Sequence, residues 1–204
     1  MARPSNTETR REEIVLGLQR AMAERGYEKA SIAAIAEAAG LTPGLVHYHF
    51  ASKQEILLAL LERLARIWRG RAAALNPSSP RERVGALLDA WLALDGSSDR
   101  DALACWVALG AEAIRQPEVR EPYERAVRAA HVELSSAVLA CLDAEQCTSA
   151  DSALIAAGLM AAISGFMQLG VATSGVIAPG TAARTLRTMA FGVIDARPSA
   201  KGTP

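Results

Sequence analysis

The chain has 204 residues, half of them apolar and 4% aromatic, and its 22 basic and 22 acidic side chains leave no net charge. This length allows a substantial core, whereas the zero net charge excludes a general electrostatic attraction to nucleic acid, so any DNA-binding surface must be local. The abundance of Ala and Leu favours helices over strands. We therefore predict an all-α protein.

The first fifty residues predict three helices. The first has a regular apolar stripe and ends at Gly26, a residue that readily adopts the left-handed conformation of a helix C-terminus. Ser31 is positioned to cap a second, short helix that ends at Gly40, and Thr42 to cap a third helix of barely two turns with Pro43 in its first turn. Two short helices joined by a tight turn that contains Gly predict a helix-turn-helix.

The rest of the chain also contains residues that mark where helices start and end. Capping boxes at 52–55 and 79–82 predict two helix starts, in which the Ser hydroxyl accepts from the Glu amide and the Glu carboxylate accepts from the Ser amide. Breaks at Asn76-Pro77 and Asp95-Gly96 predict the ends of these helices. The remaining predicted helices span about 99–115, about 118–143, about 149–172 and about 180–196.

The stretch from Ala153 to Ala172 has only Ser164 and Gln168 as clearly polar residues and is long enough to cross a bilayer. Much of it is Ala and Gly, which favour membrane insertion only weakly, and no basic cluster flanks it. We interpret it as a helix buried in the protein and in a subunit interface, with a membrane anchor as the alternative.

The N-terminal motifs resemble a known family. The residues Gly26-Tyr27, Ser31-Ile32, Ile35-Ala36, the run 39–44, the run 46–50 and Ser52-Lys53 are similar to the DNA-binding domain of the TetR family over about residues 10–56. Residues about 100–175 resemble the subgroup that contains the choline-responsive repressor of the betaine pathway. The resemblance implies a homodimeric repressor that a small-molecule effector releases from a palindromic operator.

Under this interpretation the chain divides into a helix-turn-helix domain (1–51), a linking helix (52–76), a ligand-binding and dimerisation domain (77–197) and a tail (198–204). The resemblance places Pro43, Gly44 and Leu45 against base edges, where they can offer only backbone approach and apolar contact. Most family members have an aromatic residue where His47 stands. The residues expected to contact DNA are Ser31, Thr42, Pro43, Gly44, Leu45, His47, Tyr48, His49 and Lys53, of which Thr42, Tyr48, His49 and Lys53 match phosphate-contact positions.

The C-terminal part supplies two further sets of candidates. Large side chains that suit an effector pocket, with aromatic faces able to hold a cation or a neutral apolar ligand, are Trp91, Trp106, Tyr123, Met160, Phe166 and Met167. Small and apolar residues that suit close helix packing between two subunits are Leu154, Gly158, Ala161, Ala162, Gly165, Leu169, Leu186 and Val193.

Three function classes remain in competition: a DNA-binding repressor, a membrane-anchored helical regulator and an all-helical enzyme. The sequence contains no Gly-x-Ser-x-Gly, P-loop or His-Glu-x-x-His motif, so we expect no enzyme activity. His47 and His49 are two residues apart on a helix and do not face each other, so we expect no metal and no cofactor. Cys105, Cys141 and Cys147 form no Cys-x-x-Cys pair and are interpreted as packing thiols of a cytoplasmic protein.

Overall fold

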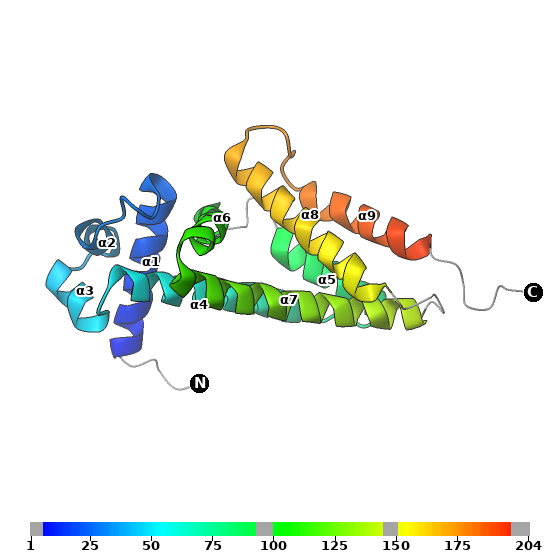
Figure 1. Ribbon diagram of the computed structural model, residues 1–204, viewed down its shortest axis with the longest axis horizontal. Helices are drawn as coiled ribbons and strands as arrows, with labels where there is room; N and C mark the ends of the chain where they lie inside the picture. Colours follow the sequence, from blue (N-terminus) through cyan, green and yellow to red (C-terminus); the bar gives the residue numbers. More distant parts are fainter. Residues whose placement is uncertain (1–5, 93–99, 145–150, 197–204) are drawn as a thin grey trace, which may run out of the picture. The chain divides into compact units, whose positions relative to one another are not determined.

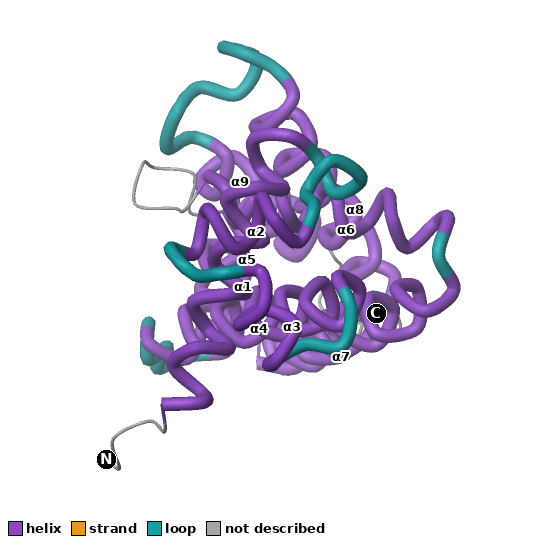
Figure 2. Tube along the Cα trace, turned by 90° about the vertical axis from the view of Figure 1, so that its left-hand side faces the viewer, coloured by secondary structure: helices purple, strands orange, loops and turns teal. Residues whose placement is uncertain are grey.

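The computed structural model describes residues 6–92, 100–144 and 151–196, and every regular element among them is a helix (Figures 1 and 2). The all-α prediction is confirmed. The helices are α1 (Asn6–Arg25), α2 (Ile32–Ala39), α3 (Pro43–His49), α4 (Lys53–Ala74), α5 (Pro80–Leu92), α6 (Arg100–Arg115), α7 (Pro117–Ala144), α8 (Ser152–Ala172) and α9 (Ala182–Asp195). The expected break at Asp95-Gly96, Cys147 and the tail lie outside the described residues.

The chain forms two compact units. The first contains the residues up to Ala65 together with Asp101–Tyr123, and the second contains Arg66–Arg100 and the residues from Glu124 onward. Helices α4 and α7 therefore contribute residues to both units. Each unit is described separately below.

The predicted start of α4 is confirmed, with one difference in detail. The Glu55 amide donates to the Ser52 hydroxyl at 3.1 Å, as a capping box requires. The Glu55 carboxylate, however, accepts from the Ala51 amide at 2.8 Å rather than from the amide of Ser52. Because hydrogen bonds to a carboxylate favour its charged form, this bond and a second one from Arg11 lower the pKa of Glu55 despite some burial.

The second capping box, at the start of α5, shows the same displacement. The Glu82 amide donates to the Ser79 hydroxyl at 3.1 Å, and the Glu82 carboxylate accepts from the Ser78 hydroxyl at 2.6 Å and the Ser78 amide at 2.8 Å. These bonds lower the pKa of Glu82. Both carboxylates thus bond one residue earlier than predicted, while the predicted helix starts are correct.

The core of the first unit depends on a close approach of α1 and α2. Ile14 and Leu18 on α1 and Ile35 on α2 are fully buried. Between them, a Cβ atom on Gly17 would lie 2.6 Å from the Ile35 carbonyl oxygen and 2.9 Å from the Ala39 Cβ atom. Both distances are shorter than van der Waals contact, so only glycine at position 17 allows the two helices to lie this close.

In the second unit, α9 lies beside α8 (Figure 1) and is joined to α5 by two ion pairs. Arg81 makes a bidentate pair with Asp195 at 2.8 and 2.9 Å, and Arg187 pairs with Asp89 at 3.1 Å. Among the described helices, α8 is apolar enough to cross a bilayer by length and composition, with a mean hydropathy of 1.8, and 28% of this stretch is buried. Its exposed residues include large apolar side chains, of which Leu154 is 70% and Leu169 41% exposed.

A glycine pair tests the α1–α2 contact. Gly17→Ala should destabilise the protein by about 1–3 kcal/mol, because the added methyl group meets backbone atoms that cannot rotate away. Gly70→Ala on α4, where nothing lies within 4 Å of the added methyl group, should leave stability unchanged or raise it by up to about 1 kcal/mol. Thermal unfolding measures both, and equal effects of the two substitutions would contradict the close contact.

Candidate nucleic-acid interface

The predicted helix-turn-helix is present in the first unit. The Ser31 hydroxyl caps α2 by accepting from the Ala34 amide at 3.2 Å, and the Thr42 hydroxyl caps α3 by accepting from the Leu45 amide at 3.3 Å. Gly40 has a φ of +68°, the left-handed conformation expected at the end of α2. These local signals place α3 immediately after a tight turn.

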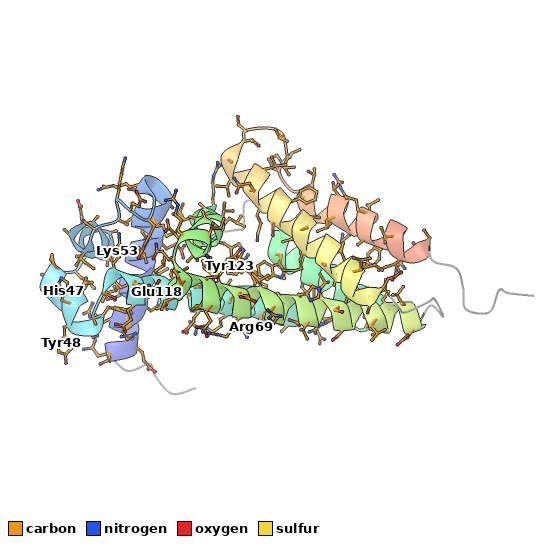
Figure 3. The ribbon with its side chains drawn as sticks, in the orientation of Figure 1. His47, Tyr48, Lys53, Arg69, Glu118 and Tyr123 are labelled. Carbon is orange, nitrogen blue, oxygen red and sulfur yellow. The ribbon has the colours of Figure 1, made fainter. Side chains whose placement is uncertain are left out.

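The outer face of α3 carries most of the predicted DNA contacts. Tyr48 is 81% exposed, and both Tyr48 and His47 point away from the rest of the first unit (Figure 3). The Tyr48 ring meets the His49 ring edge to face, with their centroids 5.0 Å apart. Of the nine predicted residues, Ser31, Thr42, Pro43, Gly44, His47 and Tyr48 are exposed, and Leu45, His49 and Lys53 are partly exposed.

Lys53 differs from a free surface lysine. Its ammonium group donates to the carbonyl oxygens of Tyr27 at 2.9 Å and Glu28 at 3.3 Å, and it lies 4.2 Å from the centre of the Tyr27 ring. It therefore ties the first turn of α4 to the turn between α1 and α2. These two bonds use two of the three N–H donors of the ammonium group and leave one for a DNA phosphate. The phosphate contact of Lys53 stays a prediction.

Sequence reasoning missed Arg11. This residue of α1 donates from Nη1 to the His49 carbonyl oxygen and from Nη2 to Glu55 Oε1 at 3.2 Å, and its guanidinium lies 3.9 Å from the centre of the Phe50 ring. Arg11 thus contacts the end of α3, the connection to α4 and the first turn of α4. Nothing in the local sequence pattern of α1 signals these contacts, because their partners are some forty residues away.

The predicted effector residues fall in both units. In the first, the Trp106 and Tyr123 rings lie 5.1 Å apart at 38°, and a Cβ atom on Gly110 would come within 3.0 Å of the Tyr123 hydroxyl. Burial raises the pKa of Tyr123. In the second, Trp91 stacks on Trp68, a residue not among the candidates, with centroids 4.5 Å apart. Each of these two ring pairs therefore lies within a single unit.

The three remaining effector candidates lie on α8 of the second unit. Met167 is 1% exposed, and Met160 and Phe166 are partly exposed. The structure thus pairs the Trp106 and Tyr123 rings within the first unit and places Met160, Phe166 and Met167 on one helix of the second. Their ligand contacts stay a prediction.

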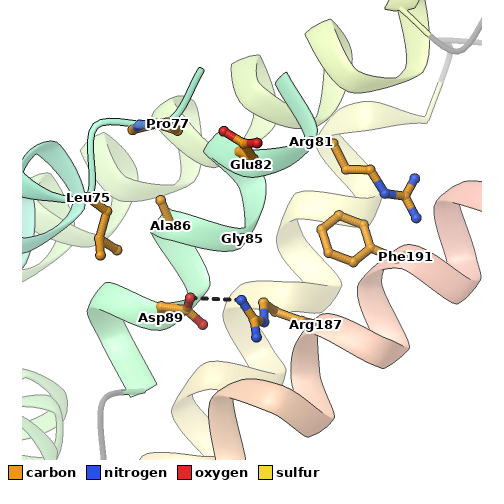
Figure 4. Close-up of a pocket in the computed structure, with 9 residues that line it drawn as sticks. All are labelled: Leu75, Pro77, Arg81, Glu82, Gly85, Ala86, Asp89, Arg187 and Phe191. Atoms are coloured by element: carbon orange, nitrogen blue, oxygen red, sulfur yellow. Dashed lines mark hydrogen bonds and ion pairs between the residues drawn. The ribbon is translucent and has the colours of Figure 1, made fainter. Parts of the chain in front are cut away.

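A groove of about 360 Å³ opens between α5 and α9 of the second unit (Figure 4). It is lined by Leu75, Pro77, Arg81, Glu82, Gly85, Ala86, Asp89, Arg187 and Phe191. The two interhelical ion pairs flank the groove. The Arg81 guanidinium also lies 4.3 Å from the centre of the Phe191 ring. Burial raises the pKa of Asp89, although the nearby charge of Arg187 acts to lower it. None of the predicted effector residues lines this groove.

The residues predicted for the subunit interface are mostly exposed. Leu154 is 70% exposed, and Gly158, Ala161, Gly165, Leu169 and Val193 are exposed as well. Ala162 is partly buried, and Leu186 is fully buried in the core of its own unit, so its side chain packs within the subunit. Within the described parts of the chain, no three His, Cys, Asp or Glu side chains are grouped to hold a metal ion. Cys105 and Cys141 are buried thiols, and the Cys105 thiol donates to the Gln19 carbonyl oxygen at 3.3 Å.

Comparison with known proteins decides the family. Residues 18–60 match the family described as bacterial regulatory proteins, tetR family, and residues 80–194 match the BetI-type transcriptional repressor C-terminal domain. The chain belongs to the TetR family. It is 33% identical over 151 residues to the HTH-type transcriptional regulator BetI of Rhizobium meliloti, covering 72% of this chain and 74% of that protein. The resemblance seen in the sequence is thereby confirmed for both halves.

Other similar proteins are also transcriptional regulators. BetI of Pseudomonas aeruginosa strain PAO1 is 32% identical over 169 residues, covering 80% of this chain and 82% of that protein. A transcriptional regulator from Saccharomonospora viridis, solved in complex with choline, is 26% identical with a TM-score of 0.78 over 93% of this chain and 97% of that chain. A Rhodococcus transcriptional regulator shares the fold, with a TM-score of 0.79 at 20% identity over 92% of this chain and 97% of that chain. This protein is thus a DNA-binding transcriptional regulator with a helix-turn-helix domain.

Proposed function

We propose that this protein is a cytoplasmic repressor that binds a palindromic operator as a homodimer and leaves it when a small molecule binds. The observation that supports DNA binding by this surface is the exposed face of α3, where Tyr48 is 81% exposed although it is a large aromatic residue. Gly44 supports it, because nothing lies within 4 Å of where its Cβ atom would be. The packing of the subunit therefore does not require glycine there, and the missing side chain leaves room for a DNA groove to approach the backbone.

We propose that α8 and α9 form the subunit interface. Leu154, Gly158, Ala161, Gly165 and Leu169 recur at spacings of three and four residues, so they form one exposed stripe along α8. On α9, Val193 is 46% exposed. Small residues let two helices approach closely, and a two-fold axis pairs the same stripe with itself. A second copy of the chain is also the partner expected for an apolar helix in a regulator that binds a palindrome.

We further propose a quaternary ammonium compound as the effector. The support is the choline complex of the Saccharomonospora viridis regulator and the aromatic pair Trp106–Tyr123 in this chain. An aromatic face that is shielded from water can stabilise such a cation by about 2 kcal/mol, or roughly thirtyfold in affinity. A neutral apolar ligand is the alternative.

The DNA contacts are tested by two variants in the first turn of α4 and the last turn of α3. Lys53→Ala should weaken binding to all duplexes alike and lower the slope of log K against log salt by about two units for the dimer, because each subunit loses one phosphate charge. Tyr48→Phe should weaken operator binding with an unchanged slope, because the phenol is neutral. Fluorescence anisotropy over a salt series measures both. A changed base preference of Lys53→Ala at an unchanged slope would count against the phosphate contact.

The interface is tested by placing a charge on the α8 stripe. Ala161→Arg should give monomers or insoluble protein, because two arginines would be buried without partners across the two-fold axis. We choose Ala161 because it is exposed, whereas Ala162 is partly buried in its own subunit. Ala73→Arg, at an exposed position near the end of α4, is the matched control and should remain dimeric. Analytical ultracentrifugation distinguishes the species. A dimeric Ala161→Arg places the interface elsewhere, and sedimentation of the wild type with membranes would support an anchor.

The effector proposal is tested with choline as the probe. Trp106→Leu should weaken choline binding by about thirtyfold, Trp106→Phe should retain most of the affinity, and operator affinity without choline should stay near wild type for both. Calorimetry with choline and anisotropy with operator measure the two affinities, and thermal unfolding checks that the variants fold. Equal choline affinity of the folded Leu variant and the wild type removes Trp106 from the site. No binding of choline or other quaternary ammonium compounds to the wild type refutes the cation.

A further inference from the structure

The connection between α3 and α4 is held at consecutive residues by two side chains. The His49 carbonyl oxygen accepts from Arg11, and the Phe50 ring, which is 2% exposed, lies 3.9 Å below the Arg11 guanidinium. The next residue, Ala51, donates its amide to Glu55 at 2.8 Å. Arg11 and Glu55 are themselves paired at 3.2 Å. We call Arg11 and Glu55 together the bracket, because their contacts hold three consecutive residues of the connection, His49 to Ala51.

Only an arginine suits this position. The last carbonyl groups of a helix have no partner within the helix, and a positive charge near them is favourable. The planar guanidinium donates in two directions, to the His49 carbonyl and to Glu55, while its face covers the Phe50 ring. A lysine keeps the charge but has neither the flat face nor the fixed fork of donors.

Helix α3 needs such a restraint. It has seven residues, of which Val46 is buried, and helices of this length are not stable without external contacts. Its Thr42 cap fixes the first turn, so the bracket at the other end determines the direction in which Tyr48 and His47 point. Because both side chains project from the surface, a small rotation of α3 displaces them from the bases and phosphates they are proposed to contact.

We propose that Arg11 is a positioning residue for sequence-specific DNA binding, which orients α3 through the His49 carbonyl and the Phe50 ring. This inference rests on the proposed DNA contacts of α3. A misoriented α3 loses the correct fit to operator bases, while the attraction of the domain to any duplex remains. The competing role, a surface charge that attracts phosphate, predicts equal losses on operator and unrelated DNA.

The chain offers a matched control. Arg10 is the neighbouring arginine on α1 and pairs with Glu13 at 2.7 Å, one turn away on the same helix. Its side chain is 41% exposed, close to the 40% of Arg11. Arg10→Met therefore removes the same charge from the same helix without touching the bracket.

The experiment compares Arg11→Met, Arg11→Lys and Arg10→Met in the full-length protein. For each, anisotropy gives the affinity for operator and for unrelated duplex and the salt slope, and hydrogen exchange reports the opening of residues 43–52. Arg11→Met should lose about tenfold in operator affinity, the size expected for a charged hydrogen bond, with unchanged affinity for unrelated DNA, an unchanged slope and faster exchange confined to 43–52. Arg11→Lys should not restore the loss, and Arg10→Met should resemble wild type.

Several results would overturn the proposal. They are restoration by Arg11→Lys, an equal loss in Arg10→Met, a parallel loss on unrelated DNA with a lower slope, and no loss at all. If Arg11→Met does not fold, Glu55→Met replaces it, because it removes the acceptor of the Ala51 amide and the partner of Arg11 and should give the same selective loss. A wild-type protein without preference for operator refutes the proposed function. Loss of preference in Tyr48→Phe but not in the Arg11 variants refutes only the positioning role.

Discussion

A helix of seven residues cannot remain folded in water without external contacts, and the proposed DNA-binding surface of this protein depends on how α3 is held. Thr42 caps its first turn, Val46 is buried beneath it, and Arg11 bonds its last carbonyl group. In the same unit, Gly17 allows α1 and α2 to lie close together. His47 and Tyr48 on the exposed face of α3 take no part in these contacts, so they are available for the proposed contacts with DNA.

Much of this arrangement could be predicted from the sequence, because the signals are local. Caps at Ser31 and Thr42 and the left-handed Gly40 mark the helix ends within a few residues. Arg11 and Gly17 could not be identified in this way, since their importance comes from partners on other helices. The same reason explains Leu186, which has an apolar side chain at a plausible spacing and lies in the core rather than at a subunit surface. Periodicity identifies an apolar face and does not say which neighbour covers it.

The second unit contains the groove and the exposed apolar stripe, and its architecture follows from helix pairing. Two ion pairs join α5 to α9 on one side, and the stripe on α8 has no cover among the described residues of the subunit. Partly exposed ion pairs contribute little stability but fix the register of two helices. A ligand can release DNA only by binding the DNA-incompetent arrangement more tightly than the competent one, because equal affinity shifts no equilibrium.

The central claim is that a dimer reads a palindrome through two copies of α3. Hydroxyl-radical footprinting of the DNA upstream of the gene, with and without choline, tests it most directly. The account predicts two protected half-sites related by two-fold symmetry, with centres about one or a whole number of helical turns apart, and loss of both when the effector binds. A single protected site, or two half-sites on opposite faces of the duplex, would contradict it.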